Sequence, residues 1–131
     1  MQTGYPAKPE SIPVARNAAA RRVRELGGEE SVARAVALAV SEACTNVVLH
    51  AYRGEEAPGT MTVVVEKVGE YVCVTVLDEG LGIVPRHDSP GMGLGLPLIS
   101  QFADGVELRS RTDGGAEVSM RFELRRPCAA A

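Results

Sequence analysis

Residues 41–52 read Ser41-Glu42-Ala43-Cys44-Thr45-Asn46-Val47-Val48-Leu49-His50-Ala51-Tyr52, and they belong to the most apolar helical run of the chain, residues 31–52. Apolar side chains recur in this run at steps of three and four residues, which is the period of a helix: Val32, Val36, Ala39, Val40, Ala43 and Val47. Leu38, Val48 and Leu49 occupy other faces. We therefore predict a helix that is buried on most sides.

Three polar side chains interrupt this apolar helix. Glu42, Asn46 and His50 are four residues apart, so they line one stripe of the helix. Polar groups on a mostly buried helix are costly unless another side chain, a buried water or a ligand meets them. The motifs farther along the chain favour a ligand, with His50 contributing packing and hydrogen bonding.

Length and composition bound the class of protein. The 131 residues suffice for one domain with one core, and the 45% apolar and 24% charged residues are typical of soluble globular proteins. The net charge of -3 gives no reason to expect a nucleic acid or an anionic membrane as a partner. Aromatic residues make up only 4% and tryptophan is absent, which argues against a base-stacking surface.

The sequence contains no sign of export. Its N-terminus lacks the basic flank and apolar core of a signal peptide, and we find no apolar run of the ~18 residues that a membrane span needs. Cys44, Cys73 and Cys128 are odd in number and lack metal-type spacing, so we interpret them as free thiols. We expect a cytoplasmic protein that contacts neither membrane nor nucleic acid directly.

The coarse order of elements is two helices, two strands, a loop, a helix and two strands. We predict helices at 14–26, 29–52 and 94–102, and strands at 60–67, 71–77, 106–112 and 117–124. Strands joined by short turns must be antiparallel. The pattern predicts a two-layer α/β sandwich, a mostly antiparallel sheet covered on one face by about three helices.

One domain accounts for the chain. Residues 1–13 carry Pro6, Pro9 and Pro13 and are expected to be an extended segment that belongs to the domain. Residues 14–125 form the domain proper, and residues 126–131 form a frayed tail.

The first glycine motif, Asp78-Glu79-Gly80-Leu81-Gly82, ends an apolar strand. It could be an ordinary glycine turn capped by Asp78. It could also be a purine pocket, in which the carboxylate accepts a hydrogen bond from an exocyclic amine. Gly80 and Gly82 would then let the backbone approach a flat ring.

The second glycine motif, Gly91-Met92-Gly93-Leu94-Gly95-Leu96, opens the last predicted helix. Free N–H groups and the positive end of the helix dipole suit phosphate, although a purely structural turn is also consistent. It is not a dinucleotide fingerprint, because a proline-bearing loop precedes it rather than a strand. Nor is it a Walker A loop, because no Gly-Lys-Ser/Thr follows.

The polar stripe completes a nucleotide site. Asn46 could hold Mg²⁺ through its amide oxygen, with phosphate oxygens and water in the remaining positions. Glu42, one turn earlier, could act as general base toward a hydroxyl or water that attacks the γ-phosphate. Either residue alone could instead be a satisfied buried polar group. The order of the three motifs is far more specific than any one of them.

These motifs resemble those of the GHKL (Bergerat-fold) ATPases, and most closely those of their anti-sigma-factor serine/threonine kinase branch. Glu42-x-x-Thr45-Asn46-x-x-x-His50-Ala51-Tyr52 matches that branch's N box. Asp78-x-Gly80-x-Gly82 matches the first glycine box, and residues 91–96 match the second. The resemblance covers nearly the whole chain, including residues 12–16 and the final hairpin.

The resemblance implies a Bergerat ATP-binding fold that uses Mg-ATP. It further implies a kinase that phosphorylates serine or threonine on a STAS-type anti-anti-sigma partner, sequesters a sigma factor and often forms a homodimer. Two positions depart from the pattern. Ala116 stands where the family often has a threonine near the adenine, and Asp88-Ser89-Pro90 stands where many kinase members carry a basic residue. Charge neutralisation at the transferred phosphoryl group is normally a large catalytic contribution.

Three alternatives follow from the same residues. The chain could bind ATP and sequester a partner without turnover, because the loop lacks the basic residue. A detached sensor-kinase domain is disfavoured, since no helical segment with a phosphoacceptor histidine precedes it and residues 83–90 are too short for a long lid. A domain without any nucleotide would leave Glu42, Asn46 and Asp78 unexplained together.

Overall fold

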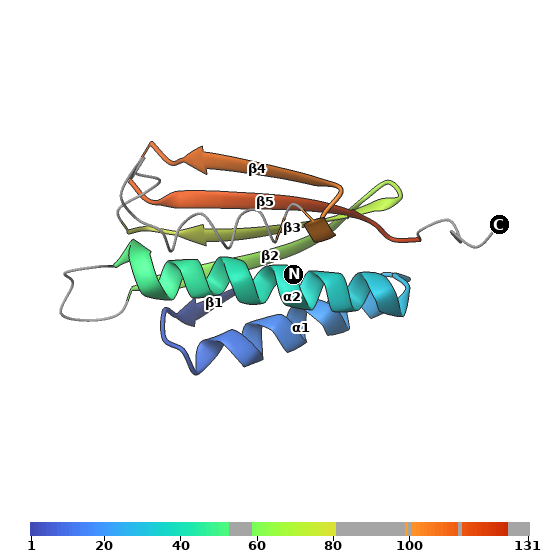
Figure 1. The fold of residues 1–131 in the computed structure, drawn as a ribbon, viewed down its shortest axis with the longest axis horizontal. Coiled ribbons are helices and arrows are strands. Elements are labelled where there is room, and N and C mark those ends of the chain that lie inside the picture. Colours follow the sequence, from blue (N-terminus) through green and yellow to red (C-terminus); the bar gives the residue numbers. More distant parts are fainter. Residues whose placement is uncertain (53–58, 81–98, 100, 113, 126–131) are drawn as a thin grey trace.

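The computed structural model describes residues 1–52, 59–80, 99, 101–112 and 114–125. Its elements are β1 (Gln2–Pro6), α1 (Ser11–Glu25), α2 (Glu30–Asn46), the π-helical turn η1 (Val47–Ala51), β2 (Thr60–Val68), β3 (Tyr71–Asp78), β4 (Gly105–Ser110) and β5 (Ala116–Glu123). Both α-helices lie against the same face of the sheet (Figure 1). The predicted two-layer α/β sandwich is confirmed.

The number of helices differs from the prediction. The described residues contain two α-helices rather than about three. The third predicted helix, 94–102, lies almost wholly outside the described residues, and only Ile99, Gln101 and Phe102 are described there, in helical conformation. The tail 126–131 also lies outside them.

The sheet has the strand order β1-β2-β3-β5-β4, and every neighbouring pair is antiparallel. The predicted hairpins β2–β3 and β4–β5 are both confirmed. The central pairing of β3 with β5 joins strands that are distant in sequence. Its register sets Asp78 opposite Ala116, so the C-terminal end of β3 meets the turn that precedes β5.

The core lies between the helices and the sheet. Alternate residues of β3 are fully buried beneath α2, namely Val72, Val74 and Val76. Because the helices cover only one face of the sheet, the outward side of α2 has no layer over it among the described residues. Leu38 and Leu49 are consequently 41% and 59% exposed, so the prediction of burial fails on this outward side, although most of the helix is buried or half-buried.

The continuous helix Glu30–Ala51 has 22 residues and is long and apolar enough to cross a membrane by length and composition. We did not expect such a segment from the sequence. Here its valines and alanines pack into the core, with Val36 and Val40 fully buried. A core helix of a globular domain has this pattern, since its apolar side replaces water contact with contact to the sheet.

The N-terminal segment is extended only in part. β1 pairs with β2 at the edge of the sheet, but α1 begins at Ser11 rather than at Val14. Pro13 therefore lies in the first helical turn. It fits there because the first N–H groups of a helix have no intrahelical acceptor, so a residue without an N–H loses nothing.

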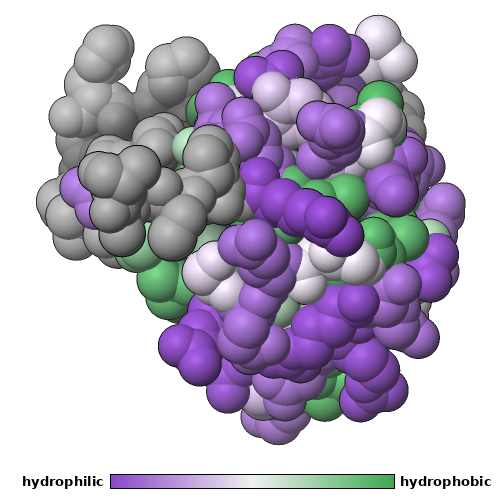
Figure 2. Space-filling model, turned by 90° about the vertical axis from the view of Figure 1, so that its right-hand side faces the viewer, coloured by the Kyte–Doolittle hydropathy of each residue, from purple (hydrophilic) through white to green (hydrophobic). Residues whose placement is uncertain are grey.

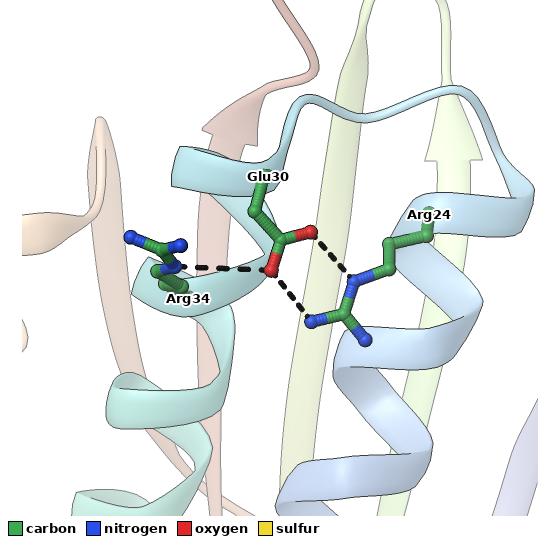
Figure 3. Close-up of polar contacts among 3 residues, drawn as sticks. All are labelled: Arg24, Glu30 and Arg34. Carbon is green, nitrogen blue, oxygen red and sulfur yellow. Dashed lines mark hydrogen bonds and ion pairs between the residues drawn. The ribbon is translucent and has the colours of Figure 1, made fainter.

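The turn between α1 and α2 carries an ion-pair cluster (Figure 3). The Arg24 guanidinium donates to both carboxylate oxygens of Glu30 at 2.8 Å, and Arg34 lies 3.8 Å from the same carboxylate. All three side chains are about half exposed or more, so solvent screens the attraction. The cluster therefore contributes little to the stability of the fold.

The surface at this end of the molecule is mostly hydrophilic. Figure 2 shows it with hydrophobic residues in small, separate patches. Scattered exposed apolar residues are normal on soluble proteins and do not mark a binding surface by themselves.

Candidate functional site

Asp78 is the last residue of β3 and one of two polar or charged residues that are buried among those described. Its Oδ1 accepts hydrogen bonds from the backbone N–H groups of Gly80, at 3.0 Å, and Ala116, at 3.3 Å. Burial raises the pKa of the Asp78 carboxyl, while those two bonds and the charge of Arg111 act in the opposite direction. A carboxylate is held at the end of a strand that is otherwise apolar on this face.

The turn between β4 and β5 closes over this carboxylate. Gly114 and Gly115 have φ of 87° and 88°, which an L side chain rarely adopts. A Cβ at Gly115 would also overlap the backbone carbonyl of Asp78. This turn can therefore approach β3 closely only because glycine stands at position 115.

Gly80 makes a second close approach. A Cβ there would overlap the carbonyl of Ala51, at the end of η1. The first glycine motif was expected to admit a flat ring, and the structure shows in addition that Gly80 lets the strand end meet the helix end. The neighbouring Gly82 lies outside the described residues.

Glu42 and Asn46 lie in the last turns of α2, and both side chains are half-buried. The predicted regular helix to Tyr52 is wrong from Val47 onward, where five residues form the π-helical turn η1. His50 lies in this turn and is also half-buried. Because a π-turn is wider than an α-turn, the stripe from Glu42 to Asn46 does not continue regularly to His50. Such turns are frequent at functional sites.

Tyr52 joins the helix end to two strands, a role that the sequence did not predict beyond its place in the N box. Its hydroxyl donates to the carbonyl of Thr60 at 2.6 Å and accepts from the N–H of Glu79 at 2.9 Å. Burial raises the pKa of Tyr52, so the hydroxyl keeps its proton at neutral pH. An aromatic residue with a polar tip at the end of an apolar helix was the available signal.

The second glycine motif, Gly91, Met92, Gly93, Leu94, Gly95 and Leu96, lies outside the described residues. Its assignment to phosphate binding therefore stays a prediction. Among the described residues, Gly80, whose N–H binds Asp78, meets the end of the helix that carries Glu42 and Asn46. No group of three His, Cys, Asp or Glu that could hold a metal ion occurs among those residues.

Comparison with known proteins bears on this arrangement. The model of the histidine kinase-like ATPase domain matches residues 5–122. The chain belongs to this family. Among its relatives is an anti-sigma F factor from Pasteuria penetrans, 33% identical, with 95% of this chain and 90% of the relative covered. Another is the serine-protein kinase RsbW from Halalkalibacterium halodurans, 32% identical, with 92% and 81% covered. The predicted resemblance is confirmed.

Solved structures agree on the fold. The structure of the RsbU and RsbW domains of Rv1364c from Mycobacterium tuberculosis superposes with a TM-score of 0.73 at 19% identity, covering 97% of this chain and 32% of that one. The histidine kinase domain of Erythrobacter litoralis EL346 superposes with a TM-score of 0.56 at 25% identity, covering 86% and 61%. The two-layer arrangement is thus the fold of histidine kinase-like ATPase domains.

Proposed function

We propose that this chain is an Mg-ATP-dependent protein serine/threonine kinase that acts as an anti-sigma factor. The observation that carries the proposal is the buried carboxylate of Asp78, enclosed by glycine turns beside the end of the helix that bears Glu42 and Asn46. Relatives named anti-sigma F factor and serine-protein kinase RsbW, aligned over nearly the whole chain, support it.

The adenine end of ATP is assigned to Asp78. Its Oδ1 is held by two backbone N–H groups, and we assign the other carboxylate oxygen to the exocyclic amine of the base. Gly82 would allow the ring to approach the backbone, whereas the space beside Gly80 is filled by the backbone of Ala51. The glycine turn 91–96 would receive the phosphates at the start of the following helix.

Asn46 fits the role of a Mg²⁺ ligand. An amide oxygen is a hard ligand, and Mg²⁺ bound with a nucleotide takes only one or two protein ligands beside phosphate and water. The half-buried position of Asn46 near the end of α2 suits such a shared site. When bound, Mg²⁺ would offset the negative charge of the phosphate oxygens.

Glu42 is assigned as the general base. The hydroxyl oxygen of a serine or threonine on the partner would form a bond to the γ-phosphorus, and the bond from that phosphorus to the bridging oxygen of ADP would break. The hydroxyl proton would pass to the Glu42 carboxylate. Because Glu42 is half-buried rather than fully enclosed, its carboxylate would be open to a side chain of a second protein.

The partners would be a STAS-type anti-anti-sigma protein, as substrate, and a sigma factor, as sequestered ligand. A homodimer and a cytoplasmic location are part of the same proposal. Arg16 and Arg21 on α1 are exposed, and they are candidates for contact with acidic groups of a partner. The sheet face opposite the helices is a second candidate surface.

A second function is favoured by the two departures from the family pattern. Ala116 gives Asp78 a backbone N–H but has no hydroxyl of its own to offer a base. A basic residue is also missing from Asp88-Ser89-Pro90. On this alternative the chain binds ATP and sequesters a partner without turnover.

A phosphotransfer assay distinguishes the kinase from the ATP-binding module without turnover. Purified protein is incubated with labelled ATP, Mg²⁺ and candidate STAS-type proteins, beside Glu42→Ala and the control Glu29→Ala, which changes an exposed glutamate at the start of the same helix. We expect transfer by the parent and the control. Glu42→Ala should lose transfer but keep ATP binding in a calorimetric titration. ATP binding and a stable complex without transfer by the parent would instead support the binding module.

A further inference from the structure

The hydroxyl of Tyr52 is shared by two strands. It donates to the Thr60 carbonyl at the start of β2 and accepts from the N–H of Glu79, directly after β3. The bonds are 2.6 and 2.9 Å long, so both are well formed. One side chain from the end of the α2–η1 helix thus holds the ends of both strands of the central hairpin.

Two glycines make this junction tight. A Cβ at Gly59 would overlap the ring of Tyr52, and a Cβ at Gly80 would overlap the carbonyl of Ala51. Gly59 has no left-handed φ, so the ring itself is what a side chain at this position would meet. The hydroxyl therefore stands at a fixed place rather than at the end of a loose side chain.

The junction is joined through the chain to both ends of the proposed nucleotide site. Asp78 is next in the chain to Glu79, and Asn46 precedes η1 in the same helix as Tyr52. Because η1 departs from the regular α-helical spacing, Tyr52 does not stand where a regular helix through Asn46 would place it. The two hydrogen bonds of the Tyr52 hydroxyl tie this end of the helix to β2 and to the residue after β3.

We infer that Tyr52 is a positioning residue that holds the base-binding end of the site, at Asp78, in register with the metal-binding end, at Asn46. The inference rests on the proposed function. When the two ends are held at a fixed spacing, the base and the phosphates of one nucleotide bind cooperatively. Without the hydroxyl, each end of the site would still bind its own part of the nucleotide. The gain in affinity that comes from binding the base and the phosphates together would be smaller.

The test compares Tyr52→Phe with Tyr71→Phe. Tyr71 is the matched control, because its hydroxyl donates only a 3.4 Å bond to Glu123 at the opposite end of β3. Calorimetry gives the Kd of Mg-ATP and of adenosine for each variant. In Tyr52→Phe we expect the Kd of Mg-ATP to rise about tenfold, and that of adenosine to stay within about twofold because Asp78 keeps its own backbone bonds. The control should change neither.

The contrast between the two ligands excludes a merely structural role. Equal weakening of adenosine and Mg-ATP would mean that only the base pocket was damaged, and it would overturn the inference. Unchanged binding of both would overturn it too. If the parent binds neither ligand, the proposed function itself fails, which is a different result. Gly59→Ala offers an independent variant, since its methyl would displace the Tyr52 ring while the hydroxyl remains; it should reproduce the selective loss of Mg-ATP binding.

Discussion

Replacing Asp78 by asparagine changes one oxygen of a buried carboxylate to an amide NH₂ and leaves the volume almost unchanged. The remaining oxygen can still accept from Gly80 and Ala116, so the turn keeps its bonds. The NH₂ group would then face the exocyclic amine of adenine, donor against donor. A hydrogen bond to a charged group contributes about 1.5–3 kcal/mol, so with the added donor clash we expect the Kd of ATP to rise at least about 100-fold.

The same replacement should not weaken the fold at neutral pH. Burial raises the pKa of Asp78 above its ordinary value of 3.8, so the folded state binds more protons than the unfolded chain between pH 3.8 and the folded pKa. The stability contributed by this carboxyl is therefore fully present below pH 3.8 and falls as pH rises through the folded pKa. Asparagine has no such dependence. The variant should thus gain in free energy of unfolding relative to the parent as pH rises from acid to neutral.

Calorimetric titration with Mg-ATP measures the effect on nucleotide binding. Urea unfolding at a series of pH values measures the effect on stability. Glu79→Gln is the control, because it makes the same chemical change at the next residue, where the side chain is exposed. It should alter neither ATP binding nor the pH profile. ATP binding by Asp78→Asn within a few-fold of the parent would refute the assignment of the base. A variant that loses stability relative to the parent as pH rises would refute the account of the buried charge.

Two further predictions concern the fold around the site. Gly115→Ala should lower the free energy of unfolding by about 1–3 kcal/mol more than Gly114→Ala in urea denaturation, because both have positive φ but only the first would overlap the Asp78 carbonyl; equal losses would contradict the proposed close approach. Cys44 is buried and free, and burial raises its pKa to about 12, whereas Cys73 is half-exposed. In a Cys128→Ser variant, a thiol reagent at pH 8 should modify one cysteine of the native protein quickly and the other only on unfolding, since the thiolate is the reactive form. Two fast thiols would contradict the buried position of Cys44.

Local signals predicted most of the fold. Gly69, with φ of 62°, closes the β2–β3 hairpin where two β-branched runs are separated by two residues. The helix starting at Glu30 followed from its apolar period. The pairing of β3 with β5, in contrast, depends on how two hairpins meet in space, and no local pattern contains that information. The exposure of Leu38 and Leu49 was missed for the same reason, because periodicity does not say how many layers cover a helix.

The sequence predicted which residues belong to the candidate site, but not the contacts that hold them together. The motif spacing singled out Glu42, Asn46 and Asp78, and the structure places Asp78 at the junction with the helix that carries the other two. The hydrogen bonds of Tyr52 and the π-helical turn were not foreseen. The bonds of Tyr52 are tertiary contacts, which no local pattern contains, and the π-helical turn ends where the Ala51 carbonyl meets Gly80. The phosphate-binding role of residues 91–96 stays a prediction.

The contacts of the glycines decide which substitutions can inform on nucleotide binding. Gly80 lies in a motif that would be assigned to the nucleotide, yet the nearest obstacle to a side chain there is the backbone of Ala51. Loss of ATP binding in Gly80→Ala would therefore follow from a displaced helix end even if no nucleotide ever touched that glycine. The same holds for Gly115, because a side chain there would displace the Asp78 carbonyl whether or not a nucleotide touches that glycine. Asp78→Asn is free of this ambiguity, because asparagine can keep both backbone bonds of the turn and differs mainly in the atom offered to the base.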